Sequence, residues 1–239
     1  TTVKTTTALA TTKAVTVTIT AGDKPVLVDT TPVVDVALNS SAPTIRANMT
    51  ASDTEDGVIT SSITLTGDSI NTALPGIYHV HYDVEDADGN VADTVTRVYV
   101  VGAKTVSGDY AIFAQSFQKR VGQVDTTHPA VLLAANATGV NIQTKQPVEL
   151  QIDTLGGYQA AVGGYNIDMS VVGEPSVTAQ ITATVVAGNK PTLSDTTPVV
   201  SLELGAVAPT LDADITASDS EDGNITGAIT VGGETVNTA

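Results

Sequence analysis

The chain repeats itself at a long interval. Residues 21–73 and 187–239 align without a gap at an offset of 166, and 31 of the 53 positions are identical. A match of this length cannot arise by chance, and a fixed period is typical of proteins built from tandem modules. The period is almost twice the length of a small sandwich domain of ~100 residues. The duplication therefore predicts that each repeating unit contains two modules.

The duplication also predicts the domain boundaries. Residues 1–22 are either a linker or the terminal strand of a preceding module, and the first module, A, covers 23–103. A second module, B, covers 104–187, and residues 188–239 are a truncated second copy of module A. This copy stops where the first one continues with strand-like residues. We expect either a longer parent protein or strands supplied by another chain, because an open sheet edge accepts a partner strand.

Strand signals dominate both modules. The segment Ile77–Val84 alternates, with Tyr78, Val80 and Tyr82 on one face, and the Asp- and Gly-rich turn at 86–90 leads into a return strand. The return strand has apolar residues at both odd and even positions, so the pattern does not indicate which of its faces points into the core. Similar signals predict strands at Pro25–Asp29, Val33–Leu38, Thr44–Ala51, Ile59–Thr66 and Val91–Val101, and in module B at Asp109–Val121, Pro147–Thr154, Gly164–Val172 and Ser176–Val186.

One short helix is predicted within module B. Thr127 is a candidate N-cap, Pro129 suits the first turn, and an alanine- and leucine-rich run ends before Gly139. We expect this helix at about 129–137. Turn signals every 8–12 residues with no other helical period complete the prediction of fold class: all-β, with tandem immunoglobulin-like β-sandwich modules.

Three motifs of module A resemble a known group of modules. They are ASDTEDGVIT at 51–60, the hairpin LPGIYHVHYDVEDADGNVAD at 74–93 and the closing TRVYVV at 96–101. The chain is similar in these segments to the bacterial immunoglobulin-like and hyalin-repeat-like modules of Gram-positive surface proteins, which include adhesins, internalin-like repeats and surface-layer proteins. The resemblance implies an extracellular or cell-surface location and a spacer or adhesive role.

Clustered acidic residues are the candidate metal ligands. They are Asp53, Glu55, Asp56, Asp86, Asp88 and Asn90, with a repeat of the first three at Asp219, Glu221 and Asp222. Calcium prefers six to eight oxygen ligands from carboxylates and carbonyls on tight turns. The alternative is that these residues are solvated turn formers. The prediction for cofactors is therefore none, or Ca²⁺ at a loop end.

Charge and hydropathy exclude several partners. With 10 Lys and Arg against 26 Asp and Glu, the net charge is −16, which disfavours nucleic acid because phosphates need basic contacts. No run of apolar residues is long enough for direct membrane insertion. Ser, His and Asp occur in no catalytic spacing, so we expect no enzyme activity and no catalytic residues.

These observations lead to one functional prediction with two alternatives. We expect a structural repeat segment, namely a stalk, fibre or surface-layer component, of a secreted or cell-surface bacterial protein. The first alternative is an adhesin module that binds a protein or glycan of a host or neighbouring cell. The second is a set of accessory domains of a large secreted enzyme. Expected partners are further copies of the chain, assembled end to end or by strand complementation, or a surface protein or glycan.

Overall fold

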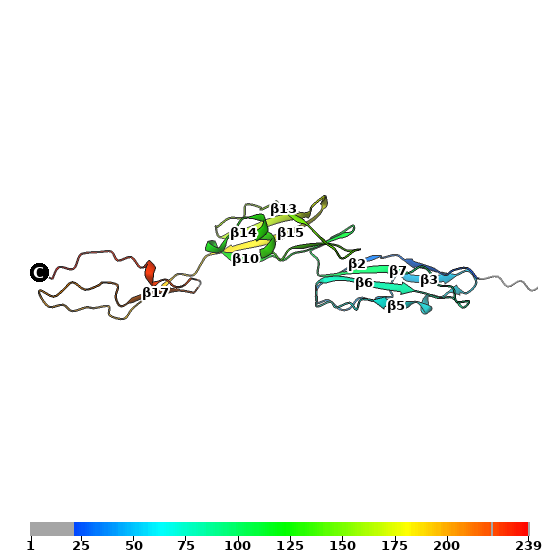
Figure 1. Ribbon diagram of the computed structural model, residues 1–239, viewed down its shortest axis with the longest axis horizontal. Helices are drawn as coiled ribbons and strands as arrows, with labels where there is room; N and C mark the ends of the chain where they lie inside the picture. Colours follow the sequence, from blue (N-terminus) through cyan, green and yellow to red (C-terminus); the bar gives the residue numbers. More distant parts are fainter. Residues whose placement is uncertain (1–21, 221, 239) are drawn as a thin grey trace, which may run out of the picture. The chain divides into compact units, whose positions relative to one another are not determined.

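The computed structural model describes residues 22–220 and 222–238. The predicted terminal segment 1–22 lies outside this range except for Gly22. The chain forms two compact units, of which the first ends at Ala103 and the second begins at Lys104 (Figure 1). Strands dominate both units, and among the described residues the only α-helix is α1, His128–Ala134. The predicted all-β fold class, with one short helix in the second module, is confirmed.

Two sheets form the first unit. One has the order β1-β3-β4 and the other the order β2-β7-β6-β5. The strands are β1 (Val26–Asp29), β2 (Val33–Val36), β3 (Met49–Asp53), β4 (Gly57–Val58), β5 (Thr64–Gly67), β6 (Gly76–Asp83) and β7 (Val95–Val101). Neighbouring strands are antiparallel, except that β2 runs parallel to β7. This arrangement is an immunoglobulin-like sandwich.

The core of this unit lies between its two sheets. Met49 and Ala51 of β3 pack in one apolar cluster with Val80 and Tyr82 of β6. The predicted inner face of β6 is confirmed, because its alternating residues enter the core. Strand β7 is buried on both faces: Tyr99 belongs to the core cluster, and residues Val98 and Val100, at the opposite parity, are 1% and 0% exposed. A strand that is buried on both faces shows no alternation of apolar and polar residues. This explains why the sequence did not indicate which face of β7 points into the core.

Three strand predictions for this unit have wrong boundaries. Residues 44–47 form a turn, in which Ala47 N–H donates to the Thr44 carbonyl at 3.0 Å, so β3 starts only at Met49. A 3-10 turn, Thr60–Ser62, replaces the first half of the strand predicted at 59–66. The return strand begins at Val95 rather than Val91, although Val91 forms an isolated bridge with Glu85.

Two four-stranded sheets form module B, with orders β12-β11-β9-β8 and β10-β15-β14-β13. The strands are β8 (Thr105–Ser107), β9 (Tyr110–Phe113), β10 (Phe117–Arg120), β11 (Thr138–Asn141), β12 (Pro147–Val148), β13 (Leu150–Thr154), β14 (Gly163–Val171) and β15 (Glu174–Val186). As β2 does with β7, β10 runs parallel to the last strand, β15. The strand predicted at 109–121 is two strands here, and β8 and β11 were not predicted.

The helix of module B ends earlier than predicted. It stops at Ala134, and Asn136 then adopts a positive φ of 47°, a conformation that commonly terminates helices. Gly139 lies instead in β11, where a Cβ atom would be 2.8 Å from Leu150 Cδ2 and 2.9 Å from Val148 Cγ2. Thr127 is the N-cap residue, but its side chain makes no capping hydrogen bond. The glycine at 139 is therefore required by close strand packing and not by helix termination.

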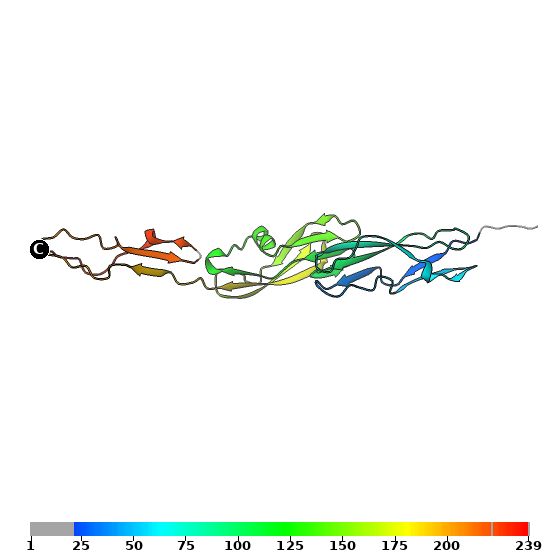
Figure 2. The same cartoon turned by 90° about the horizontal axis from the view of Figure 1, so that it is seen from below.

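The second copy of module A repeats the smaller sheet of the first. Strands β16 (Thr192–Asp195), β17 (Ile215–Asp219) and β18 (Gly223–Asn224) form it in the order β16-β17-β18. The register of Thr192 opposite Ser218 reproduces that of Val26 opposite Ser52. Figure 2 shows these strands near the C-terminal end of the chain, with irregular segments beside them.

The turn between β13 and β14 gives a sharp prediction about a glycine. Gly156 has a φ of +58°, and a Cβ atom there would lie 1.9 Å from the Asn166 carbonyl oxygen. We expect Gly156→Ala to destabilise the second unit by roughly 1–3 kcal/mol or more. The alanine would hold a strained positive φ, and the backbone at Asn166 would also have to move away from the added Cβ atom. Gly157→Ala is the matched control, since φ is +78° there but nothing lies within 4 Å. Urea unfolding measures both, and equal losses would contradict the role of the close contact.

Candidate functional site

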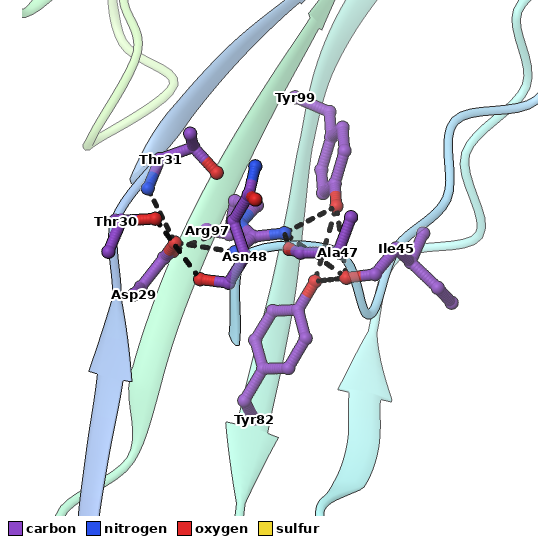
Figure 3. Close-up of polar contacts among 9 residues, drawn as sticks. All are labelled: Asp29, Thr30, Thr31, Ile45, Ala47, Asn48, Tyr82, Arg97 and Tyr99. Atoms are coloured by element: carbon purple, nitrogen blue, oxygen red, sulfur yellow. Dashed lines mark hydrogen bonds and ion pairs between the residues drawn. The ribbon is translucent and has the colours of Figure 1, made fainter. Parts of the chain in front are cut away.

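An ion pair is buried between the two sheets of the first unit. Arg97 of β7 donates from Nε to Asp29 Oδ2 at 2.9 Å and from Nη2 to Asp29 Oδ1 at 2.5 Å (Figure 3). The two side chains are only 2% and 4% exposed. Asp29 ends β1 of the smaller sheet, so this bidentate pair ties one sheet to the other across 68 residues of sequence.

The remaining polar groups around the pair are satisfied. Arg97 Nη1 donates to the carbonyl oxygens of Ala47 at 2.8 Å and Ile45 at 3.2 Å. Asp29 Oδ1 also accepts the Thr31 N–H at 2.8 Å, and the guanidinium lies 5.2 Å from the centre of the Tyr82 ring. A buried charge with complete hydrogen bonding and a bidentate partner is stable in place. This arrangement is therefore an internal cross-link, which we call the Asp29–Arg97 pair.

The charges of the pair are mutually reinforced. Burial disfavours the ionised form of Asp29, but hydrogen bonds and charge from Arg97 outweigh it and lower the pKa of the carboxyl. Burial also opposes the charged form of Arg97, and hydrogen bonding to Asp29 more than compensates, so the guanidinium pKa is raised. Burial and the Tyr99 hydroxyl raise the pKa of Tyr82. All three groups keep their ordinary protonation state at neutral pH.

The sequence analysis missed this pair. Arg97 appeared there only as part of a closing motif, and Asp29 only as a strand end. Two signals could have found it: Arg97 is a lone charge among the apolar residues of β7, and the aspartate recurs at Asp195 in an identical Asp-Thr-Thr-Pro sequence.

The predicted metal ligands lie on two neighbouring turns. Asp53 Oδ1 accepts the N–H groups of Glu55 at 2.8 Å and Asp56 at 3.0 Å. Asp86 Oδ1 accepts those of Asp88 at 2.9 Å and Asn90 at 2.8 Å. The carboxylates of Asp53 and Asp86 thus stabilise the two turns that carry the candidate metal ligands.

The two turns are joined to each other and to the start of the module. Asp56 Oδ2 accepts the Ala87 N–H at 2.8 Å, across 31 residues of sequence. Asn90 Nδ2 lies 3.4 Å from the carbonyl oxygens of Gly22 and Asp23, which it can reach as a donor. The structure therefore brings together the two acidic segments that the sequence placed apart.

The first of these turns shifts the pKa values of two of its carboxyl groups in opposite directions. Hydrogen bonds from the Asp56 and Glu55 N–H groups lower the pKa of Asp53, whereas partial burial and the neighbouring Asp53 raise the pKa of Glu55. Asp53 Oδ2 is buried and has no hydrogen-bond partner. Among the residues that the structure describes, no three carboxylate or imidazole side chains gather closely enough to hold a metal ion. The turn-forming role is visible, and calcium binding stays a prediction.

Calcium binding at these turns has a direct test. A bound ion stabilises the folded state by mass action, so a calcium site predicts that millimolar calcium raises the melting temperature of the first unit above that in chelator. Asp53→Asn should abolish the rise, because it removes the charge of the carboxylate whose Oδ2 is buried without a hydrogen-bond partner. Asp93→Asn, at an exposed carboxylate that pairs with Lys24, is the matched control. An unchanged melting temperature of the wild-type chain contradicts the calcium prediction.

The repeated acidic cluster is only partly described. Asp219 Oδ1 accepts the Asp222 N–H at 3.3 Å, as Asp53 accepts that of Asp56, whereas Glu221 lies outside the described residues. The same turn is therefore present in both copies.

A hollow on the first unit is one further place where a ligand could bind. It measures about 430 Å³ and lies beside β5, lined by Ile45, Leu65, Ile70 and Val80 among others. Asp68 is its one ionisable lining residue.

Part of the first unit matches a known protein family. Residues 45–101 match the family of bacterial surface protein Ig-like domains. Over 145 residues the chain is 27% identical to the pesticidal crystal protein Cry22Aa of Bacillus thuringiensis, an alignment that covers 55% of this chain and 20% of that protein. The chain thus spans about a fifth of the length of this curated relative.

Solved structures give more distant likenesses. One contains CBM51-2 in complex with GlcNAc and INT domains from Clostridium perfringens ZmpB, at 16% identity and a TM-score of 0.30, covering 61% of this chain and 32% of that one. Another is the lipoprotein BT2262 from Bacteroides thetaiotaomicron, at 17% identity and a TM-score of 0.30, covering 70% and 85%. Neither likeness bears on function. The family match and the two-sheet fold together confirm the resemblance seen in the motifs: over residues 45–101 the first unit is similar to bacterial surface protein Ig-like domains.

Proposed function

We propose that this chain is a stalk-like structural repeat segment of a secreted or cell-surface bacterial protein. The observation that carries the proposal is a topology shared by both complete modules. In the first unit β2 pairs in parallel with the last strand, β7, and in module B β10 pairs in parallel with the last strand, β15. Each module therefore closes with an earlier and a final strand side by side and pointing the same way.

This pairing suits a protein that is pulled along its chain. Once the strands that precede it in the module (β1 before β2, and β8 and β9 before β10) have been pulled out, a force applied at the two ends of a module draws the parallel pair in opposite directions along the strands. The hydrogen bonds between them are then loaded together in shear and not broken one at a time. In the first unit the Asp29–Arg97 pair adds a second tie between the sheets, of which one member lies on β7 itself. A spacer that holds a binding or catalytic domain away from a cell surface needs this resistance.

Further findings support a scaffold role. The repeated region preserves turn and core positions, as expected when modules are added without a new design. No helix among the described residues is long and apolar enough to cross a membrane. The adhesin alternative requires a specific ligand, and the enzyme-accessory alternative requires a catalytic domain in the same protein.

Single-molecule stretching of the full chain tests the proposal. We expect the two units to unfold in separate steps, each lengthening the chain by roughly 3.4 Å per released residue. Val34→Pro should lower the unfolding force of the first unit. Pro32 and Val36, at alternate positions of this segment, both accept N–H groups from the side of β7, so the backbone of Val34 faces β7 too. Proline there removes a ladder donor.

Val34→Ala is the matched control, because it removes the same core packing and keeps the N–H group. The proposal requires a lower unfolding force for Val34→Pro than for Val34→Ala. Equal forces for the two variants, or wild-type units that extend without a resolved force peak, would contradict a stalk closed by parallel strands. A glycan array and a pull-down from host extract test the adhesin alternative, because only an adhesin is expected to bind a glycan or host protein specifically.

A further inference from the structure

The outer edge of β5 is open. In the described part of the chain β5 pairs only with β6, so it ends the sheet β2-β7-β6-β5 (Figure 1). The Asp68 N–H donates to the His79 carbonyl oxygen at 2.8 Å, which continues the register of the two strands. Residues of an antiparallel strand bond to its partner alternately, so Thr66 bonds to β6 whereas Leu65 and Gly67 direct their N–H and C=O groups to the open edge. These groups are available to a further strand.

Most other edge strands carry residues that prevent such an addition. Strands β1, β2, β13 and β16 each contain an aspartate, β10 contains Lys119 and Arg120, and β12 begins with Pro147. Charges and proline at a sheet edge oppose pairing between chains. The residues of β5, Thr64–Gly67, include neither, although the whole chain has a net charge of −16. A second copy of this chain therefore meets no like charge within β5 itself.

Opposite charges flank the two ends of β5. Arg46 Nη1 donates to the Ile63 carbonyl oxygen at 2.7 Å, just before the strand begins. Because Ile63 lies two residues before Leu65, this bond is on the open-edge side of the strand. Asp68 follows the strand at its other end, where its Oδ2 accepts the His79 N–H at 2.7 Å. When two β5 strands lie antiparallel, the basic end of each copy meets the acidic end of the other.

From these observations we propose that β5 pairs antiparallel with β5 of a second copy of this chain, which joins the two larger sheets into one. Leu65 of each copy then lies opposite Gly67 of the other, and the two Thr66 residues lie opposite each other. Arg46 sets this register, because it occupies the Ile63 carbonyl oxygen and so ends the pairing on that side. Charge complementarity at both ends favours a second copy over a strand of unrelated sequence.

The hollow beside β5 supports the same register. It is lined by Leu65, Ile70 and Val80 among others, and also by Gly67. Val80 belongs to the core and is 3% exposed, so the hollow reaches the core of the first unit. Gly67 has no side chain to cover it, since its φ is +96° and a Cβ atom there would lie 2.4 Å from the His79 carbonyl oxygen. Leu65 of the second copy, opposite Gly67, would cover this hollow.

The inference goes beyond the stalk proposal, because a stalk can act as a single chain. A strand of four residues gives an interface that is small beside the ~1,000 Å² of stable complexes. We therefore expect a weak association in solution, which salt strengthens by screening the net negative charge of the two copies. A covalent cross-link captures such a pair.

Cysteine substitution tests the pairing directly, because the chain contains no cysteine. In the proposed register the two Thr66 Cα atoms lie ~4.5 Å apart, which suits a disulfide. The two Thr64 Cα atoms are separated by four residues along the strand, more than ~13 Å, which a disulfide cannot span. Under mild oxidation of the full chain, Thr66→Cys should form covalent dimers at least about tenfold faster than the control Thr64→Cys. Equal rates, or no dimer with Thr66→Cys, would overturn the inference.

A charge exchange tests the two ends of the interface. In the Thr66→Cys chain, Arg46→Asp and Asp68→Arg should each slow dimer formation on the order of threefold, and the two together should restore the rate. Glu174→Arg, at an exposed residue of the second unit, is the control for net charge and should not slow it. Thermal melting verifies that the first unit of each variant is folded. A folded double variant that stays as slow as the single ones would overturn the charge contact.

Discussion

Asp29→Ala is expected to destabilise the first unit by about 3–5 kcal/mol, the cost of leaving one member of a buried ion pair without its partner. The substitution strands the Arg97 guanidinium between two sheets, where its side chain is 2% exposed. Water cannot replace the lost carboxylate there without opening the core. Urea unfolding of the full chain, followed through the transition of the first unit, measures the loss.

A double-mutant cycle separates the pair from its surroundings. Arg97→Met alone should be destabilising because it leaves Asp29 buried and unpaired, whereas Asp29→Ala combined with Arg97→Met should lose much less than the two single losses added together. Lys24→Ala is the control, since Lys24 and Asp93 form an ion pair at 3.3 Å with side chains 67% and 99% exposed. Exposed pairs contribute ~0–1 kcal/mol. An Asp29→Ala loss no larger than that of Lys24→Ala would contradict the cross-link.

The same pair predicts a dependence on pH. The folded-state pKa of Asp29 lies below its ordinary value because Arg97 stabilises the carboxylate against the effect of burial. The stabilisation is therefore fully present above the unfolded-state pKa of ~3.9 and is lost as the pH falls through the lower folded-state pKa. The difference in stability between the wild type and Asp29→Asn should thus be constant near neutral pH and shrink in strong acid. If the difference stayed constant as the pH fell below the folded-state pKa of Asp29, the result would contradict an ionised Asp29–Arg97 pair.

Ile167→Ala is expected to destabilise the second unit by about 2–5 kcal/mol. Ile167 lies on β14 opposite Ile181 of β15, and both belong to the core of module B at 0% and 2% exposure. Truncation removes buried apolar contacts and leaves a cavity that the two paired strands cannot easily close. Calorimetry or urea unfolding of the full chain measures the change.

Val162→Ala is the matched control for this prediction. Val162 lies just before β14 and is 66% exposed, so its truncation should change stability by less than about 0.5 kcal/mol. Because the two units have separate cores, we also expect Ile167→Ala to leave the transition of the first unit in place. A shift of both transitions by the same amount would show that the two units unfold as one.

Local patterns in the sequence predicted a large part of the fold. The alternation of Tyr78, Val80 and Tyr82 predicted a strand and its inner face, because side chains of a strand point alternately to its two faces. The 53-residue duplication at an offset of 166 indicated modular construction, and Pro129 indicated the start of the helix. The acidic residues at 53–56 and 86–90 were predicted to be calcium ligands or, alternatively, turn formers, and neither interpretation predicted the contact between the two segments. Apart from the duplication, these features depend on neighbours within a few residues.

Tertiary structure decided what depends on distant neighbours. Asp29 and Arg97 meet across 68 residues, and Asp56 reaches Ala87 across 31, which no local periodicity records. The inner face of β7 was undecided because both of its faces are buried, and Gly139 is constrained by Leu150 and Val148 of the adjacent chain segment. Burial and pairing are properties of the assembled sheets, and the sequence of one strand cannot determine them.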